Sequence, residues 1–264
     1  LDQNGLQTGT AKTLNSNHQT NLDGFTLAAG ASQTFTVAGN ISSTATGNGG
    51  QIVALQVVAI NTGATVSGSL PISGASQTIN TTLTLGSVST TTSSYDPGAA
   101  QSKSIGDSAV RVSGLRFTAG SAEDLKLYNI RWRQVGTASA SDISNVMTFV
   151  NDTGYPTTLS ADGKYYTTIF PGGLLVAKGT SVDVYNKVDF VGSNSASRTV
   201  DFDLDKVTDV YFVGQTYGYG VAPSGTATPW FNGYVTTILG GSATTIGKAN
   251  EVAAQNLAAN VPNQ

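Results

Sequence analysis

The chain has 264 residues, and only 11% of them are charged, less than half of the roughly 25% usual in soluble globular domains. Ser and Thr together supply 63 residues, whereas Glu occurs twice and Met once. A helical bundle is therefore excluded and β-strands are favoured. A net charge of −3 and an isoelectric point near 4.9 leave no basic surface for nucleic acid. The absence of cysteine excludes disulfides and thiol nucleophiles.

The composition also indicates where such a protein functions. A cysteine-free, weakly charged chain rich in Ser, Thr and Gly is typical of an exported surface protein of a bacterium or archaeon. No apolar run approaches the roughly 18 residues of a membrane span. Residues 1–100 carry only four charges, and the remaining residues carry 25. We expect either that a neighbour, a glycan or a lattice covers this uncharged region, or that its hydroxyl groups keep it soluble.

Periodicity predicts strands along most of the chain. Apolar residues alternate with polar ones in Phe25–Ile41, Ile52–Ile60, Ala109–Phe117, Leu125–Arg133 and Thr199–Asp205. Clusters of Gly, Asn, Asp and Pro separate these runs and are typical of turns. Many short strands at a spacing of about 8–12 residues indicate β-sandwiches.

The same alternation predicts the core. We expect six apolar side chains to be buried in a first sandwich and five in a second: Leu27, Phe35, Val37, Val53, Leu55 and Val57, followed by Val176, Val184, Phe202, Leu204 and Val207. The acidic residues that alternate with the last group are expected to face solvent, namely Asp201, Asp203 and Asp205.

An internal repeat is the strongest signal in the sequence. The stretch Phe25–Ile41 aligns with Leu174–Phe190 at an offset of 149 residues, so that Gly30 meets Gly179. Under the same offset Leu1 corresponds to Val150. The alignment therefore predicts that the first copy lacks equivalents of about Val110–Phe149, and that the chain begins within one repeat and ends where another would start.

These observations predict an all-β fold of two tandem immunoglobulin-like β-sandwiches, the first of them incomplete. Residues 1–109 are assigned to the incomplete sandwich, 110–245 to the second, and 246–264 to a linker or a donated strand. An open sandwich exposes apolar core and unpaired backbone groups, which is unfavourable in water. We expect either upstream strands of the same polypeptide or a strand donated by a neighbouring chain to fill the gap.

The order of motifs resembles a known kind of repeat. A short turn, DQNG or NDTG, precedes a Thr-rich run, then AAGAS or AKGTS, then an alternating strand that ends in Ile or Phe. This pattern resembles the immunoglobulin-like repeats of bacterial surface-layer and cell-surface proteins. The resemblance implies stacked sandwiches displayed outside the cell, assembled into sheets or filaments and often stabilised by calcium or glycans.

Residues for catalysis are few. His18 is the single histidine and lies in a polar stretch without a nucleophile-elbow motif around a partner serine. The 14 Asp and two Glu residues provide carboxylates, but no pair of them forms a recognisable acid–base constellation. We expect no enzymatic activity.

Turn residues offer candidate calcium ligands and modification sites. With no Cys and one His, any bound ion should be calcium with oxygen ligands rather than zinc. The candidate ligands are Asp152, Asp162, Asp183 and Asp189. The sequons for glycosylation begin at Asn40, Asn80 and Asn151.

The densest aromatic region runs from Tyr211 to Tyr234, and we interpret it as core rather than as a sugar-binding platform. Taken together, the sequence predicts an extracellular, cell-surface structural protein that self-assembles into a surface layer or filament. The alternative is an adhesin or carbohydrate-binding surface module, and a glycan-active enzyme ranks third. The expected partners are copies of the chain itself, with glycans as a further candidate, and no nucleic acid or membrane span. The sequence establishes no cofactor, and calcium is the one candidate.

Overall fold

The computed structural model describes residues 1–2, 6–41, 46–192, 195–224 and 235–239. Within them the protein is all-β, as the sequence predicts, with two short 3-10 turns, η1 (Thr46–Asn48) and η2 (Val207–Asp209). The chain forms two compact units. Unit 1 comprises Leu1–Gln3 and Thr8–Thr84, and unit 2 comprises Asn4–Gln7 and Leu85–Gln264.

Eighteen strands are present in the described residues. In chain order they are β1 (Ile52–Val53), β2 (Gln56–Val57), β3 (Ile72–Ser73), β4 (Gln77–Thr78), β5 (Val88–Thr92), β6 (Gln101–Ser104), β7 (Val110–Ala119), β8 (Leu125–Gly136), β9 (Ile143–Val150), β10 (Thr153–Pro156), β11 (Thr158–Leu159), β12 (Tyr165–Val176), β13 (Ser181–Phe190), β14 (Thr199–Asp203), β15 (Val210–Gly214), β16 (Gly220–Val221), β17 (Pro223–Ser224) and β18 (Thr236–Leu239).

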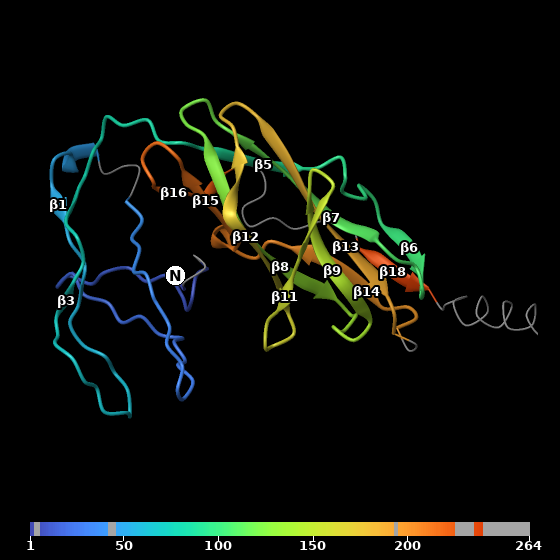
Figure 1. Ribbon diagram of the computed structural model, residues 1–264, viewed down its shortest axis with the longest axis horizontal. Coiled ribbons are helices and arrows are strands. Elements are labelled where there is room, and N and C mark those ends of the chain that lie inside the picture. The colour runs from blue at the N-terminus through green and yellow to red at the C-terminus, as the bar shows by residue number, and fades with distance from the viewer. Residues whose placement is uncertain (3–5, 42–45, 193–194, 225–234, 240–264) are drawn as a thin grey trace, which may run out of the picture. The chain divides into compact units, whose positions relative to one another are not determined.

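Unit 2 is a two-sheet sandwich (Figure 1). One sheet has six strands in the order β10-β9-β13-β7-β5-β17. The other has eight strands and follows the order β11-β12-β8-β14-β18-β6, with β15 and β16 attached beside β8. Neighbouring strands are antiparallel except for the pairs β17–β5 and β18–β6, which are parallel. The long strands β7, β8 and β13 occupy central positions, so they pair on both edges.

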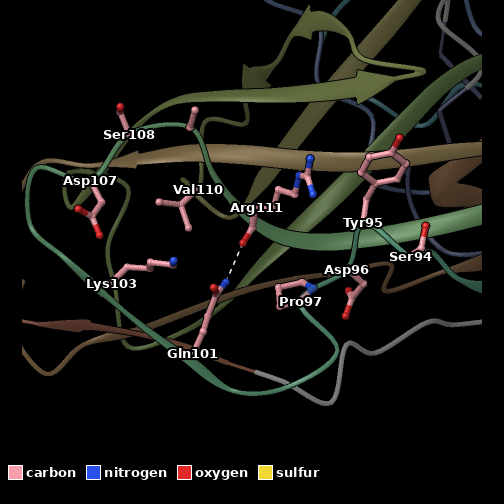
Figure 2. A pocket seen from close by; sticks show the side chains of 11 residues that line it. Ser94, Tyr95, Asp96, Pro97, Gln101, Lys103, Asp107, Ser108, Val110 and Arg111 are labelled. Atoms are coloured by element: carbon pink, nitrogen blue, oxygen red, sulfur yellow. Dashed lines mark hydrogen bonds between the residues drawn. The ribbon is translucent and has the colours of Figure 1, made fainter.

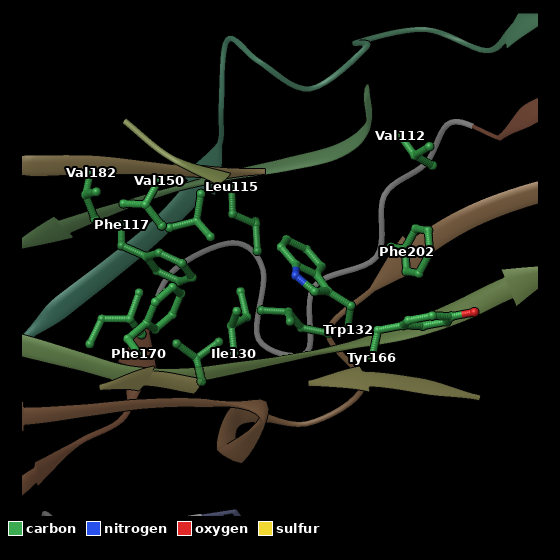
Figure 3. Close-up of a cluster of buried hydrophobic side chains, with 14 of the residues drawn as sticks. Val112, Leu115, Phe117, Ile130, Trp132, Val150, Tyr166, Phe170, Val182 and Phe202 are labelled. Carbon is green, nitrogen blue, oxygen red and sulfur yellow. The ribbon is translucent and has the colours of Figure 1, made fainter. Parts of the chain in front are cut away.

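The core of unit 2 fills the space between these sheets (Figure 3). Leu115 and Phe117 of β7 face Ile130 and Trp132 of β8, and all four side chains are fully buried. One polar pair inside the core joins the two sheets. The indole Nε1 of Trp132 donates to Oγ1 of Thr148 over 3.0 Å. The buried indole therefore contributes a large apolar area to the core while its N–H keeps a hydrogen-bond partner.

The predicted core of the second sandwich is largely confirmed. Val176, Val184, Phe202 and Leu204 are buried, whereas Val207 is half-buried in η2.

The prediction that Asp201 and Asp203 face solvent is wrong, because both are buried. β14 pairs with β8 on one edge and β18 on the other, and every residue from Val200 to Asp203 is buried, so both faces of the strand are covered. On one of these faces Ser113 of β7 donates its hydroxyl to Asp201 over 2.8 Å. Asp205 lies beyond the end of β14 and is half-buried.

Unit 1 has much less regular structure. Its strands are two residues each, and they pair as β1 with β4 and β2 with β3. The predicted core of the first sandwich is wrong as a statement about burial, since no described residue of unit 1 is buried. The alternation itself holds in one stretch, where Val53, Leu55 and Val57 are half-buried between exposed neighbours.

Residues 85–109 belong to unit 2, although the sequence assigned them to the first sandwich. The reason is strand pairing at long range. β5 pairs with β7 along its whole length, and β6 pairs with β18 near the other end of the chain. The whole of the segment 246–264 assigned to a linker or donated strand lies outside the described residues, as do Trp230, Phe231 and Tyr234.

Candidate functional site

The internal repeat is visible in the backbone of unit 1. The turn at 28–31 has the same geometry as the turn at 177–180 in unit 2. In each, the last amide donates to the first carbonyl oxygen over 3.0 Å. The third residue, Gly30 or Gly179, has φ of +74°, a left-handed conformation that glycine adopts without steric cost. Two segments 149 positions apart thus form one and the same turn.

A second pair of turns also supports the internal repeat. In the turns at 15–18 and 160–163 the fourth amide donates to the first carbonyl oxygen over 2.9 Å. The fourth residue is left-handed in both, with φ of 57° at His18 and 70° at Gly163. The offset is slightly shorter here, which a small difference in loop length explains.

The pairing of backbone segments supports the internal repeat as well. The amino group of Leu1 donates to the carbonyl oxygen of Thr36 over 2.7 Å, and the amide of Thr36 donates back over 2.8 Å. In unit 2, Val150 at the end of β9 pairs with Val184 of β13. The repeat alignment maps Leu1 onto Val150 and places Thr36 within one residue of the position equivalent to Val184. Unit 1 therefore repeats the two turns that flank the β12 region of unit 2 and the pairing of β9's end with β13.

The two copies differ in what covers them. Apolar side chains at equivalent positions are exposed in unit 1 and buried in unit 2. The equivalent pairs and their exposed fractions are Leu27 (60%) and Val176 (3%), Phe35 (37%) and Val184 (0%), and Ile41 (58%) and Phe190 (0%). Because local geometry is shared, the difference comes from partners and not from register.

Those partners are β7, β8 and β9. In unit 2, β13 pairs with β7 on one edge and β9 on the other, and β12 pairs with β8. Val184 lies opposite Leu115 of β7, and Val176 lies opposite Leu125 of β8. Among the described residues of unit 1, no strand takes these positions.

We refer to the exposed apolar side chains of unit 1, taken together, as its open face. Within it the rings of Phe25 and Phe35 are in contact, with centroids 4.7 Å apart, and contiguous apolar patches on soluble proteins mark interaction sites. The open face comprises Leu14, Leu22, Phe25, Leu27, Phe35, Val37, Ile41, Ile52, Val58, Ile60, Val66, Leu70, Ile72 and Leu83.

Unit 2 contains a shallow polar hollow of about 550 Å³ (Figure 2). It is lined by the segment that follows β5, by β6 and by the start of β7. Gln101 donates to the carbonyl oxygen of Arg111 over 2.7 Å along one wall. Burial raises the pKa of Asp96, although the amides of Gly98 and Gly114 that hydrogen-bond to its carboxylate oppose this rise. These bonds fix a turn, so the carboxyl group has a structural role.

An aromatic row lies on the outer face of the six-stranded sheet beside this hollow. Tyr185 stacks on Tyr95 with ring centroids 4.5 Å apart and on Phe149 at 5.5 Å. Arg111 and Lys187 lie over these rings at centroid distances of 4.8 Å from Tyr95 and 4.1 Å from Phe149. Tyr185 is fully buried by this packing. The ring of Tyr185 is covered by Tyr95 and Phe149, and cations lie over the rings of Tyr95 and Phe149. This packing does not present Tyr185 as an open platform for a sugar ring.

The expected calcium ligands form ion pairs or hydrogen bonds with other groups of the protein. Asp183 binds Arg116 at 2.7 Å, and this contact, aided by Ser93, lowers its pKa. Asp152 accepts the hydroxyl of Tyr185 at 2.6 Å.

The other two candidate calcium ligands, Asp189 and Asp162, also hydrogen-bond to protein groups, and each has different partners. Asp189 accepts the amide of Ala109 and the side chain of Asn145. Asp162 is exposed, and the hydroxyl of Ser160 lowers its pKa. Within the part of the chain that the structure describes, no three His, Asp or Glu side chains form a metal cluster. Calcium binding stays a prediction, which a fall in melting temperature on adding a chelator would support.

The sequon asparagines Asn40, Asn80 and Asn151 are all exposed. Asn80 accepts the amides of Thr82 and Leu83, and Asn151 lies in the tight turn between β9 and β10 with φ of 47°. Glycosylation at these positions stays a prediction.

His18 is exposed in unit 1 and lies in the turn described above. The aromatic region predicted to be core contains both buried and exposed side chains. Phe212 is fully buried and packs on Phe117 at 5.3 Å, whereas Tyr217 and Tyr219 are exposed.

Buried charges of unit 2 were missed by the sequence analysis. Asp209 is fully buried and binds the guanidinium of Arg131, and burial raises its pKa against the effect of that cation. Glu123 is also buried, and its carboxylate accepts amides from Gly86 and Thr216. No periodic signal distinguishes such residues from solvated ones, since their burial depends on strands remote in sequence.

No protein-family model matches the chain, and no curated protein matches it. A cohesin module from a family 33 glycoside hydrolase of Clostridium perfringens is 11% identical at a TM-score of 0.30, with 60% of this chain and 98% of that one covered. AvmM, which catalyses macrocyclization in alchivemycin A biosynthesis, is 8% identical at 0.27, with 58% and 82% covered. A family 123 glycoside hydrolase from Clostridium perfringens is 10% identical at 0.29, with 59% and 27% covered. Likenesses this weak carry no argument about function. No helix among the described residues is long and apolar enough to cross a membrane.

Proposed function

We propose that this chain is a non-catalytic structural protein of the cell surface that self-assembles through the open face of unit 1. The observation that carries the proposal is the contrast between the two repeat copies. Leu27 and Phe35 are exposed, while their equivalents Val176 and Val184 are buried. Covering this face removes apolar area from water, which is the dominant favourable term in protein association.

Composition supports the extracellular part of the proposal. The chain has no cysteine and few charges, and hydroxyl residues supply much of its polar surface. Unit 1 is the less charged part, and a surface with few charges associates without desolvating many ions. The resemblance to surface-layer repeats agrees with an ordered layer or filament as the assembled form.

Sedimentation velocity and negative-stain electron microscopy test the proposal with a matched pair of variants. Leu27 is 60% exposed in unit 1, and Leu175 is 63% exposed in unit 2. Leu27→Asp should weaken assembly at least tenfold in protein concentration, a change of about 1.4 kcal/mol. Leu175→Asp should leave it unchanged. A full chain that stays monomeric at high concentration, or two variants that assemble equally well, would refute the proposal.

A further inference from the structure

We propose that the polar hollow of unit 2 binds an acidic saccharide, whose carboxylate contacts the guanidinium of Arg111 and the ammonium of Lys103. The hollow has a volume of about 550 Å³, within the roughly 300–1,000 Å³ of ordinary ligand sites. Such sites are usually lined by apolar side chains, whereas polar side chains predominate in this one. A hollow with this lining matches a ligand that is polar over its whole surface.

Arg111 differs from the other arginines of the chain. Its guanidinium lies over the rings of Tyr95 and Tyr185, at 4.8 and 5.4 Å from their centroids. Among the described residues no carboxylate forms an ion pair with it, whereas each of the other four arginines has one: Arg116 with Asp183, Arg131 with Asp209, Arg133 with Asp205, and Arg198 with Asp142. A guanidinium binds a carboxylate through two parallel N–H donors. The fork of Arg111 therefore suits the carboxylate of a ligand.

A second cation lies on the wall of the same hollow. Lys103 is half-buried on β6, and within the described part of the chain its ammonium forms no ion pair. Lys103 and Asp107 lie at one end of the hollow and Tyr95 at the other, with Arg111 between them (Figure 2). Two cations along one hollow, neither in contact with a carboxylate of the protein, favour a ligand that carries negative charge.

The carboxylates of the hollow are held by backbone amides. Asp96 accepts the amides of Gly98 and Gly114, each over 2.9 Å, and Oδ2 of Asp107 accepts the amide of Ser104 over 2.9 Å. Asp107 is exposed, and its Oδ1 is placed to accept a hydroxyl group from a ligand. The hollow thus presents cations for a carboxylate together with an acceptor for hydroxyl groups. A uronic acid carries both of these groups on one ring.

The walls of the hollow are fixed by hydrogen bonds within the protein. Nε2 of Gln101 donates to the carbonyl oxygen of Arg111 over 2.7 Å and to Oγ1 of Thr236 over 3.0 Å, so one amide links β6 to β7 and β18. Fixed walls reduce the entropy that binding must overcome. Because the whole chain has a net charge of −3, attraction of an anionic saccharide must come from these local cations.

Isothermal titration of the full chain with tetragalacturonate tests the inference, and the methyl ester of this saccharide is the uncharged matched ligand. The ester should bind at least tenfold more weakly, because it lacks the carboxylate charge. Arg111→Gln should weaken the binding of tetragalacturonate at least tenfold, a change of about 1.4 kcal/mol, and Lys103→Gln should weaken it as well. Arg116→Gln is the matched control. It removes the same charge from the same strand but outside the hollow, and should leave the affinity unchanged.

Hydrogen exchange of the unsubstituted chain gives a second reading that does not depend on the folding of any variant. Tetragalacturonate should slow amide exchange within 94–111 and leave the rest of unit 2 unchanged. No binding at millimolar saccharide, equal binding of the ester, or protection confined to other segments would overturn the inference. Sodium sulfate that binds as tightly as tetragalacturonate would also overturn it, because the hollow would then recognise an anion without the saccharide.

This inference goes beyond the proposed function and fails separately from it. The hollow lies within unit 2 and uses no residue of the open face, so Leu27→Asp should bind tetragalacturonate as the native chain does. A chain that assembles through Leu27 but does not bind the saccharide refutes this inference alone. A chain that binds the saccharide through Arg111 but stays monomeric refutes self-assembly alone.

Discussion

The ion pair between Arg131 and Asp209 is the most informative place to perturb unit 2. Asp209 is fully buried, and Nε of Arg131 donates to its Oδ1 over 2.7 Å. The amide of Lys206 donates to the other carboxylate oxygen over 2.8 Å. Arg131→Met keeps a long apolar side chain on β8 but leaves a buried carboxylate with one backbone donor. We expect strong destabilisation, because the cost of burying the charge is no longer offset.

Removing one member of a buried pair costs about 3–5 kcal/mol. For a unit of this size each kcal/mol lowers the melting temperature by about 2–4 °C, so Arg131→Met should lower it by about 6–20 °C. Urea titration followed by tryptophan fluorescence, to which the buried Trp132 contributes, measures the same loss as a free energy of unfolding. Arg116→Met is the matched control, since Arg116 is an exposed partner of Asp183 and should change stability little.

The loss of stability in Arg131→Met should depend on pH. Burial raises the pKa of Asp209 above its unfolded value, so ionisation of this group opposes folding. Its contribution to stability is present below the unfolded pKa and is lost as pH rises through the folded pKa. Without Arg131 that pKa rises further, so the deficit of Arg131→Met should be largest near neutral pH and smaller near about pH 5. Equal losses in the two Met variants, or a deficit that does not change with pH, would refute the reasoning.

Three further predictions concern unit 2. Glu123→Ala removes a carboxylate that accepts three backbone amides, and should cost about 2–4 kcal/mol of unfolding free energy by urea titration. Gly136→Ala would bring a Cβ to 2.3 Å from the carbonyl oxygen of Thr199 at φ of +99°, and calorimetry should record a loss of about 2 kcal/mol or more. Burial and a hydrogen bond to Asp152 raise the pKa of Tyr185 to about 12, so Tyr185→Phe should remove one late tyrosine ionisation from an absorbance titration. The stability that Tyr185 contributes is present below about pH 10 and is lost as pH rises through about 12.

Each of these has a control in the same unit. Asp124→Ala removes the acceptor of the Lys178 amide and should cost less than Glu123→Ala. Gly98→Ala has a positive φ but open space around its Cβ, so it should cost less than Gly136→Ala. Tyr219→Phe, at an exposed position, should leave the late ionisation in place. The reverse order in any pair contradicts the corresponding prediction.

The sequence by itself determined the fold class, the repeat and much of the core of unit 2. Abundant Thr and Val and scarce Glu and Met favour strands whatever the environment, since these are preferences of the residue itself. Alternation placed Val184 and Phe202 on the buried face of their strands. The Gly-containing turns at 28–31 and 177–180 are local structures, so the same motif forms the same turn in both units.

Only the tertiary structure decided which of these faces is covered. The alternation pattern is the same around Phe35 and Val184, yet one side chain is exposed and the other buried, because β7 and β9 lie beside β13 alone. Asp201 and Asp209 show the converse, in which strands remote in sequence bury acidic residues that composition alone assigns to solvent. A strand's sequence determines which side of it is apolar, but burial requires a second surface, and that surface comes from residues far along the chain.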